Sequence, residues 1–218
     1  MNIHRVYGLF MSHFRRKRMQ RFENVLHIVD GLHIIDVGGT QYNWQFIKHR
    51  CRIVVINLSK PAEWDNRVKD ISFEQGDGTK MKYDSKAFDI VYSNSVIEHL
   101  GTWEQQRAFA NECSRVGKEL WIQTPAKCFP VEPHLITPFI HWFPLGLQAR
   151  LMRNFTLWGI ITRPTRQFID GFLKERRLLT YREMMHLFPD CQILKEKFLG
   201  LTKSYIAVKY FDNDFRCE

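Results

Sequence analysis

The sequence predicts an α/β fold built on a mostly parallel β-sheet with helices on both faces. Short apolar runs recur along the chain, and helical stretches or long connections separate them, which is typical of parallel strands joined by crossovers. The last two β-patterned runs, residues 191–200 and 203–211, are too close for a crossover and, if they pair at all, must pair antiparallel. With 218 residues and 44% hydrophobic side chains, the chain can bury the core of one domain, which excludes a disordered or collagen-like protein.

The expected elements of the first half follow in order. Residues 14–29 place apolar side chains on one face at helical spacing with the arginines opposite, which predicts an amphipathic basic helix within residues 1–30. Residues 95–115 predict a long helix after the fourth strand. The expected strands cover residues 32–37, 51–58, 71–78, 87–94 and 119–124, and Pro125 ends the last of them.

The pattern changes after residue 124. Residues 125–149 are rich in proline and aromatic residues and are expected to form an irregular loop, whereas residues 150–175 are expected to be helical in part. Thr180 is the expected N-cap of a further helix within residues 179–190. We therefore expect one domain over residues 1–218, with a core over 31–124, a helical and aromatic lid over 125–178, and a C-terminal helix and strands over 179–218.

The net charge of +9 is concentrated in two segments. Residues 1–30 hold six Lys and Arg against two acidic residues, and residues 145–182 hold eight against two. Such segments suit nucleic acid, anionic lipid or a phosphorylated substrate, and they also occur as solvated helix faces. The five cysteines form no CxxC pair, so neither a disulfide framework nor a metal site is indicated. Since no signal peptide or membrane span is found either, we expect a cytoplasmic protein.

Polar residues and glycines follow four of the expected strands. Ligands of parallel sheets bind beyond the carboxyl ends of strands, where glycine lets the backbone approach closely. One Gly-Gly turn after a strand is weak evidence for a ligand site, but four such strand ends in succession strengthen that evidence. The dinucleotide pattern GxGxxG is absent, and Asn57 stands where a nicotinamide site uses an acidic residue. The candidate binding residues are Asp36, Gly38, Gly39, Thr40, Asn57, Leu58, Asp77, Gly78, Ser93 and Asn94.

Several motifs occur in a characteristic order between Leu32 and Phe211: DVGGT, INL, GDG, FDIVYSNSVIEHL and IQTP. In this order they resemble the class I S-adenosylmethionine-dependent methyltransferases, especially small bacterial-type members of the type 11 group. The resemblance implies a Rossmann-like sheet of seven strands with an antiparallel last strand, and S-adenosyl-L-methionine as cofactor. Thr40 and Tyr42 stand where the family has further glycines, and Asn57 replaces its acidic residue.

The resemblance also implies a role for each strand end. The loop of Asp36, Gly38, Gly39 and Thr40 would shape the methionine end of the cofactor pocket. The remaining roles are ribose and adenine contact for Asn57 and Leu58, the adenine edge for Asp77 and Gly78, and the floor near the sulfonium for Ser93 and Asn94.

Methyl transfer requires a nucleophile in line with the S–CH3 bond, and a hydroxyl acceptor must also lose its proton. Histidine suits proton removal at neutral pH, although a single histidine is more often structural. The candidate catalytic residues are His99, in the expected helix after the fourth strand, and Glu132, His134 and His141, in the loop after the fifth strand.

Six aromatic residues between residues 129 and 158 alternate with Arg150 and Arg153. This composition suits a lid over an apolar acceptor with an anionic group, and it also suits contact with an anionic membrane surface. Packing within a helical subdomain is the alternative.

We expect a transferase that moves a methyl group to a small-molecule or lipid-linked acceptor, such as a saccharide or an envelope-precursor hydroxyl, by in-line displacement. Two alternatives stay open. The basic segments favour a nucleic-acid-binding or RNA-modifying protein, although the NPPY-like motif of many nucleic-acid methyltransferases is absent. The other alternative is a non-catalytic partner subunit with the same fold.

Overall fold

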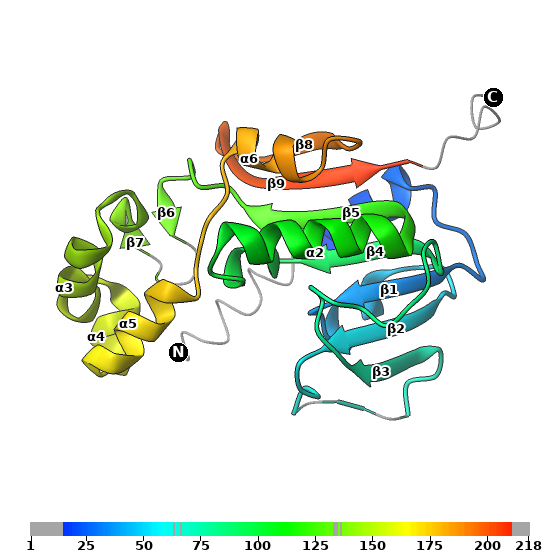
Figure 1. The fold of residues 1–218 in the computed structure, drawn as a ribbon, viewed down its shortest axis with the longest axis horizontal. Coiled ribbons are helices and arrows are strands. Elements are labelled where there is room, and N and C mark those ends of the chain that lie inside the picture. Colours follow the sequence, from blue (N-terminus) through cyan, green and yellow to red (C-terminus); the bar gives the residue numbers. More distant parts are fainter. Residues whose placement is uncertain (1–14, 63, 66, 133–134, 136, 211–218) are drawn as a thin grey trace. The chain divides into compact units, whose positions relative to one another are not determined.

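A computed structural model describes residues 15–62, 64–65, 67–132, 135 and 137–210. Its strands form a seven-stranded sheet in the order β3-β2-β1-β4-β5-β9-β8, with six parallel strands and an antiparallel last strand, β9 (Figure 1). The predicted fold class is therefore confirmed. The strands of this sheet are β1 (His33–Val37), β2 (Arg52–Asn57), β3 (Ile71–Gln75), β4 (Phe88–Asn94), β5 (Gly117–Pro125), β8 (Gln192–Phe198) and β9 (Leu201–Lys209).

The described residues fall into two compact units. The first unit takes its residues from 1–94, 112–121 and 209–218, and the second from 95–111 and 122–208. The four strands β1 to β4 therefore belong to the first unit, whereas the helices after β5 belong to the second.

In the first unit, β1 pairs in parallel with both β2 and β4. Ile35 of β1 lies opposite Val54 on one side and Val91 on the other. Ile35 and Val91 are fully buried, as expected for strands covered on both faces. Because β3 pairs in parallel with β2 as well, the carboxyl ends of these strands meet at one edge of the sheet.

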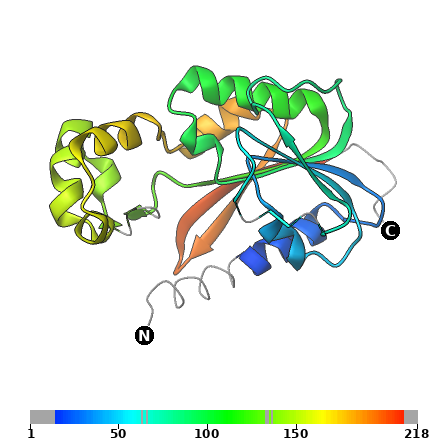
Figure 2. The ribbon, with the colours of Figure 1, turned by 90° about the horizontal axis from the view of Figure 1, so that it is seen from below.

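The N-terminal helix covers residues 15–25 (Figure 2). Its Phe22 is fully buried and anchors it to the first unit. The Phe22 ring makes edge contacts with Tyr92 at 5.1 Å, Trp121 at 5.5 Å and Trp44 at 6.2 Å between ring centroids. The expectation that the arginines lie opposite this face is wrong for Arg18, which is buried. Arg18 precedes Phe22 by four residues and therefore lies on the same face of the helix.

The helix expected over residues 95–115 is interrupted. It divides into a 3-10 turn, η2 (Ile97–His99), and an α-helix, α2 (Trp103–Val116). Gly101 lies between them with φ of +68°, and a Cβ at this position would lie 2.8 Å from the carbonyl oxygen of Lys174. Positive φ and close backbone approach both favour glycine, so the chain turns here, and His99 lies on η2 rather than on a long helix.

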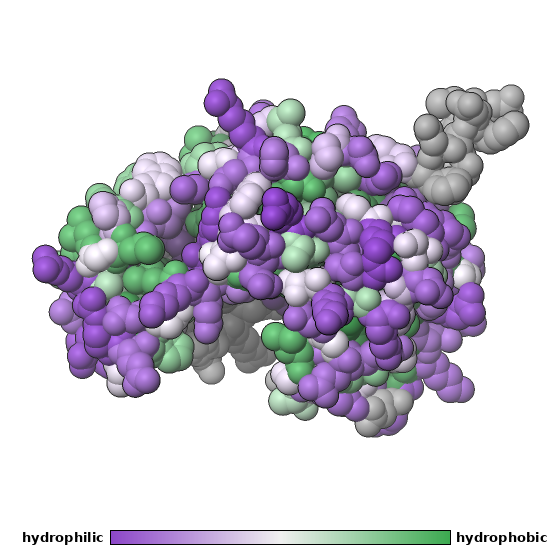
Figure 3. All heavy atoms as spheres, viewed as in Figure 1, coloured by the Kyte–Doolittle hydropathy of each residue, from purple (hydrophilic) through white to green (hydrophobic). Residues whose placement is uncertain are grey.

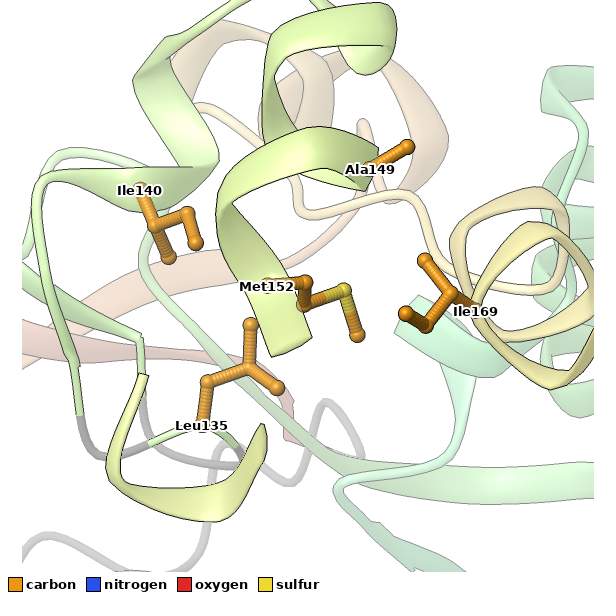
Figure 4. Close-up of a cluster of buried hydrophobic side chains, with 5 residues drawn as sticks. All are labelled: Leu135, Ile140, Ala149, Met152 and Ile169. Atoms are coloured by element: carbon orange, nitrogen blue, oxygen red, sulfur yellow. The ribbon is translucent and has the colours of Figure 1, made fainter. Parts of the chain in front are cut away.

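Residues 125–178 contain more regular structure than expected. Much of the segment predicted as an irregular loop forms short strands, a 3-10 turn and the start of a helix. Met152 of that helix packs between Leu135 and Ile169 in a small core that also holds Ile140 and Ala149 (Figure 4). The elements are β6 (Val131–Glu132), β7 (Thr137–Pro138), η3 (Ile140–Trp142), α3 (Leu145–Phe155), α4 (Leu157–Thr162) and α5 (Arg166–Lys174).

The C-terminal elements agree with the prediction. Helix α6 (Tyr181–Leu187) begins at Thr180, whose side chain accepts a hydrogen bond from the backbone of Glu183 while the Glu183 carboxylate accepts one from the backbone of Thr180. This capping box confirms Thr180 as the N-cap. Strands β8 and β9 pair antiparallel, as expected. Among the helices of the described residues, none is both long and apolar enough to cross a bilayer.

Candidate functional site

The loop after β1 is organised around the carboxylate of Asp36. Asp36 is fully buried, and Trp44 donates a hydrogen bond from Nε1 to its Oδ2 at 2.8 Å. Gly38 has φ of +77° and donates its N–H to the carbonyl of Ile56 on β2 at 2.7 Å. A Cβ at Gly39 would overlap the Asp36 carboxylate. The two glycines therefore allow the backbone to turn above a buried acidic group.

The environment of Asp36 disfavours its charge. Burial raises its pKa to about 7, and the hydrogen bond from Trp44 opposes part of this rise. Within the described part of the chain, Oδ1 of Asp36 is buried and has no hydrogen-bond partner. A buried acceptor without a donor is costly, so this oxygen is suited to a water molecule or to a cationic donor of a ligand.

Asn57 ends β2, and its side chain is held by its own loop. Its Oδ1 accepts a hydrogen bond from the N–H of Leu58 at 2.8 Å. The group left to meet a ligand hydroxyl is therefore the amide NH2, which is a donor. The neighbouring Leu58 is 68% exposed, so a flat apolar ring placed on it would remove apolar surface from water.

The turn after β3 contains Asp77 and Gly78. Oδ1 of Asp77 accepts hydrogen bonds from the N–H and the hydroxyl of Thr79, both at 2.8 Å. Asp77 is exposed, and Gly78 follows it in the turn that leads to Lys80. The Asp77 carboxylate therefore shapes this turn, and its predicted adenine contact stays a prediction.

The end of β4 is tied to two other elements. The buried hydroxyl of Ser93 donates to the carbonyl of Val37 at the end of β1, at 2.9 Å. Oδ1 of Asn94 accepts a hydrogen bond from Nη1 of Arg18 at 2.6 Å. Arg18 was not among the binding residues predicted from the sequence, although its position on the apolar face of the helix indicated that it would be buried.

The structure brings the ten predicted binding residues to one edge of the first unit. They lie in the last residues of four strands or in the loops directly after them, and these strands are adjacent in the sheet and parallel. Thr40 lies among them as the N-cap of the 3-10 helix η1 (Gln41–Phe46), which carries Trp44. Trp44 is a second residue that sequence reasoning missed, because eight positions separate it from its partner Asp36.

A family model described as "Methyltransferase domain" matches residues 35–119, which include all four strand ends. Over these residues, the match supports the predicted resemblance to the class I S-adenosylmethionine-dependent methyltransferases, and with it S-adenosylmethionine as cofactor. No curated protein sequence matches the chain significantly.

Solved structures share the fold of this chain at low sequence identity. The 1,6-didemethyltoxoflavin-N1-methyltransferase of Burkholderia thailandensis is 13% identical with a TM-score of 0.56, over 95% of this chain and 83% of its own. The magnesium protoporphyrin IX methyltransferase of Synechocystis PCC 6803 is 12% identical with a TM-score of 0.53, over 89% and 81%. Both were solved with S-adenosylhomocysteine bound. A chain in the complex of the Trm112 methyltransferase activator of Haloferax volcanii is 12% identical with a TM-score of 0.57, over 97% and 95%.

The residues at the strand ends fit this cofactor. The Asp36 oxygen without a partner suits the ammonium group of the methionine part, since a cation also favours the ionised carboxylate. The exposed Leu58 offers an apolar surface for an adenine ring, and the Asn57 amide can donate to a ribose hydroxyl. When bound, the cofactor supplies a methyl group activated by its sulfonium.

In the second unit, a buried carboxylate lies beside the candidate base His99. Glu98 is fully buried, and the hydroxyl of Thr124 at the end of β5 donates to its Oε2 at 2.9 Å. Nε2 of His99 lies 4.0 Å from Oε1 of Glu98. The imidazole of His99 is exposed and is therefore accessible to an acceptor.

Glu132 is engaged on both of its oxygens. Oε2 accepts the N–H of Leu135 at 2.5 Å, and Oε1 lies 3.5 Å from Nη1 of Arg176. Arg176 also covers the ring of Phe172 at 3.7 Å. These contacts link β6 to the segment after α5, so Glu132 has a structural role. The candidate His134 lies outside the described residues.

His141 on η3 is held by the backbone. Its Nε2 lies 3.1 Å from the carbonyl oxygen of Lys127, to which Trp142 also donates from Nε1 at 2.8 Å. Burial lowers the pKa of His141, which favours the neutral ring. The contact with Lys127 then assigns the proton to Nε2 and leaves Nδ1 as a buried acceptor.

Proposed function

We propose that the chain is an S-adenosylmethionine-dependent methyltransferase that acts on a hydroxyl oxygen of a small-molecule or lipid-linked acceptor, such as a saccharide or an envelope precursor. The observation that carries this proposal is the arrangement of Glu98 behind His99, with Nε2 of the histidine 4.0 Å from the carboxylate. An accessible imidazole with an acidic neighbour is suited to take a proton from an alcohol.

Proton removal distinguishes an alcohol from more nucleophilic acceptors. An alcohol is a weak nucleophile until its proton is taken by a base. Because Nε2 of His99 lies toward the buried Glu98, the proton would be accepted at Nδ1, and Glu98 would stabilise the imidazolium that forms, since opposite charges attract strongly in a buried setting. Thr124 fixes the Glu98 carboxylate through its hydroxyl, so Glu98 and Thr124 are positioning residues.

Among the candidate bases that the structure describes, Glu132 and His141 are less accessible than His99. Both oxygens of Glu132 are occupied by Leu135 and Arg176, and its side chain is buried. Nδ1 of His141 is an acceptor but is buried away from solvent. Of the two histidine candidates within the described residues, His99 is the exposed one, which supports it as the general base.

Transfer of a labelled methyl group tests the acceptor class. The full chain is incubated with methyl-labelled S-adenosylmethionine and, in separate reactions, with the lipid, water-soluble and RNA fractions of a bacterial extract. We expect an alkali-stable methyl ether in the lipid or the water-soluble fraction. Label in RNA, or on nitrogen or carbon of a small molecule, would contradict the proposal.

Two matched variants then test the base. His99→Gln should lower kcat by ~100-fold, the lower end of what general-base catalysis contributes, while the Kd of S-adenosylmethionine stays unchanged. His141→Gln is the control and should leave kcat within a few-fold. Glu98→Gln should lower kcat and move the pH at which the rate is half-maximal, an effect that loss of folding would not produce. Equal rates for His99→Gln and the unmodified protein would remove His99 from the mechanism.

A further inference from the structure

The segment around helices α3 to α5 has an unusual composition. Residues 133–169 contain no Asp or Glu and four arginines, Arg150, Arg153, Arg163 and Arg166. Surface helices of globular proteins normally mix both signs of charge. A surface with many more cationic than acidic residues is expected to meet an anionic partner.

The same segment exposes many large apolar side chains. Of the large hydrophobic residues exposed in the described part of the chain, more than half belong to this segment. Phe155, at the end of α3, is 70% exposed. Figure 3 shows the hydrophobic residues, in green, gathered over this segment at the left of the view. The exposed residues are Phe139, Trp142, Phe143, Leu145, Leu147, Phe155, Leu157, Ile160, Ile161 and Phe168.

None of these exposed side chains belongs to the buried core beneath them, although Phe168 stacks on Trp158, which packs against that core. That core consists of Leu135, Ile140, Ala149, Met152 and Ile169, which are buried (Figure 4). A concentrated apolar surface outside a completed core marks an interaction site more often than scattered exposed residues do.

A cationic pocket lies between α3 and α5. It measures about 290 Å3 and is lined by Arg150, Arg153, Asn154 and Arg166, with Ala149 and Ile169 as apolar lining. Arg166 is partly neutralised by Asp170, whose carboxylate lies 3.1 Å from Nε. Within the described residues, no ion-pair or hydrogen-bond partner is found for Arg150 or Arg153. Guanidinium groups bind phosphate oxygens bidentately, so the pocket suits a phosphate group.

We propose that the segment α3 to α5 docks on an anionic bilayer, with a lipid phosphate in the pocket of Arg150, Arg153 and Arg166 and the exposed aromatic and aliphatic side chains in the interfacial layer. Aromatic and aliphatic residues beside arginines are typical of helices that lie in the plane of a membrane surface. Each basic residue near an anionic surface adds to the attraction.

Charge complementarity favours this occupant over a second copy of the chain. A symmetric dimer through the same surface would bring the arginines of both copies together without any acidic residue of 133–169 to balance them. A nucleic acid would satisfy the arginines but would leave the aliphatic side chains without apolar contact. The docking goes beyond the proposed function, since it requires no methyl transfer.

Co-sedimentation of the full chain with vesicles tests the proposal. One vesicle type is phosphatidylcholine alone, and the other contains equal parts of phosphatidylcholine and phosphatidylglycerol. We expect the protein to pellet with the mixed vesicles and not with phosphatidylcholine, and to be released as salt is raised. Pelleting with neither vesicle, or equally with both, would overturn the proposal.

Matched variants locate the surface. Arg150→Gln combined with Arg153→Gln should weaken binding to the mixed vesicles about thirtyfold, since each basic residue contributes ~1 kcal/mol at an anionic surface. Phe155→Ser should weaken binding without changing its dependence on salt. Arg182→Gln, an exposed arginine on α6, is the control and should bind nearly as well as the unmodified protein. Unchanged binding by the double variant would overturn the assignment.

Two further measurements distinguish an anionic bilayer from soluble phosphate and from a second copy of the chain as the partner of this surface. Inorganic phosphate at the concentration of the lipid phosphate should not displace the protein, and complete displacement would indicate a site for soluble phosphate instead. Sedimentation without vesicles should show a monomer, and a dimer that Phe155→Ser dissociates would indicate self-association. Methyl transfer to an acceptor in solution needs no vesicles, so its outcome is independent of this test.

Discussion

The indole of Trp44 donates a hydrogen bond of 2.8 Å to Oδ2 of the fully buried Asp36. This contact joins the end of β1 to η1 and gives the buried carboxyl one of the donors that it needs. The pKa of Asp36 is nevertheless raised to about 7, because burial outweighs the single hydrogen bond. The consequence is a dependence of stability on pH.

Asp36→Asn should flatten that dependence. The carboxyl titrates near pH 4 when unfolded and near 7 when folded, so between these values the folded state binds the proton more tightly. The free energy of unfolding should therefore fall as pH rises through this window, by up to ~1.4 kcal/mol per pH unit. Asparagine keeps the acceptor for Trp44 and removes the titration.

Urea unfolding at several pH values between 4 and 7 gives the measurement. The advantage of the unmodified protein over Asp36→Asn should shrink steadily as pH rises. If the free energy of unfolding changes with pH in the same way for both proteins, Asp36 is ionised in the folded state over this whole pH range. Isothermal titration with S-adenosylmethionine on the same samples should also show weaker binding for the variant at pH 8, where the unmodified carboxyl is charged.

Gly39→Ala should destabilise the first unit by ~1–3 kcal/mol, as overpacking of a core does. The added methyl group would overlap the Asp36 carboxylate, which is fully buried. Gly171→Ala on α5 is the control, because nothing lies within 4 Å of its Cβ position, and it should be neutral or slightly stabilising. If the overlap causes the destabilisation, the double variant Gly39→Ala with Asp36→Ser should recover part of the lost stability. If the losses of the two single variants simply add, the overlap is not the cause.

Asn57→Asp should strengthen cofactor binding. One carboxylate oxygen can keep the bond from the Leu58 N–H, and the other would accept from the ribose hydroxyls with a full charge, which makes hydrogen bonds about twice as strong. We expect the Kd of S-adenosylhomocysteine in calorimetry to fall about fivefold, equivalent to ~1 kcal/mol. Asn24→Asp adds the same charge at an exposed position of the N-terminal helix and should have no effect. An unchanged Kd for Asn57→Asp would place the ribose elsewhere.

Arg176→Met should destabilise the second unit by ~3 kcal/mol, because it leaves Glu132 buried without its cation. The side chains of Arg176 and Glu132 are 18% and 6% exposed, so water cannot replace the lost partner. Adding Glu132→Gln should restore part of the stability, and a double-mutant cycle in urea measures the coupling. Arg166→Gln, whose pair with Asp170 is exposed, should change stability by less than ~1 kcal/mol. Strict additivity at the buried pair would show that the two residues act separately.

The sheet and the location of the binding residues could be predicted because their signals are local. Each strand is an apolar run that ends in a glycine or a polar residue, and adjacency of parallel strands then brings distant loops such as those of Asp36 and Asp77 to one edge. The engagement of Asn57 by Leu58 and of Ser93 by Val37 could not be predicted. These contacts depend on loop geometry, which the periodic pattern of apolar residues does not indicate.

The full extent of the helices after β5 could not be predicted from the sequence either. Prolines and aromatic residues suggested an irregular loop, yet α3 begins directly after Pro144. Proline is compatible with a helix start because its fixed φ is close to the helical value and the first N–H groups need no partner within the helix. Arg18 was misjudged because its charge suggested exposure, whereas its spacing from Phe22 indicated burial.

The position of β9 has a consequence for synthesis. β9 follows β8 in the chain but lies between β5 and β8 in the sheet. A ribosome-bound chain that has released residues only up to 200 therefore cannot attach β8 to the preceding strands, whatever their stability. Completion of the sheet must await emergence of residues 201–209, and until then β5 exposes an unpaired edge to chaperones and to neighbouring nascent chains.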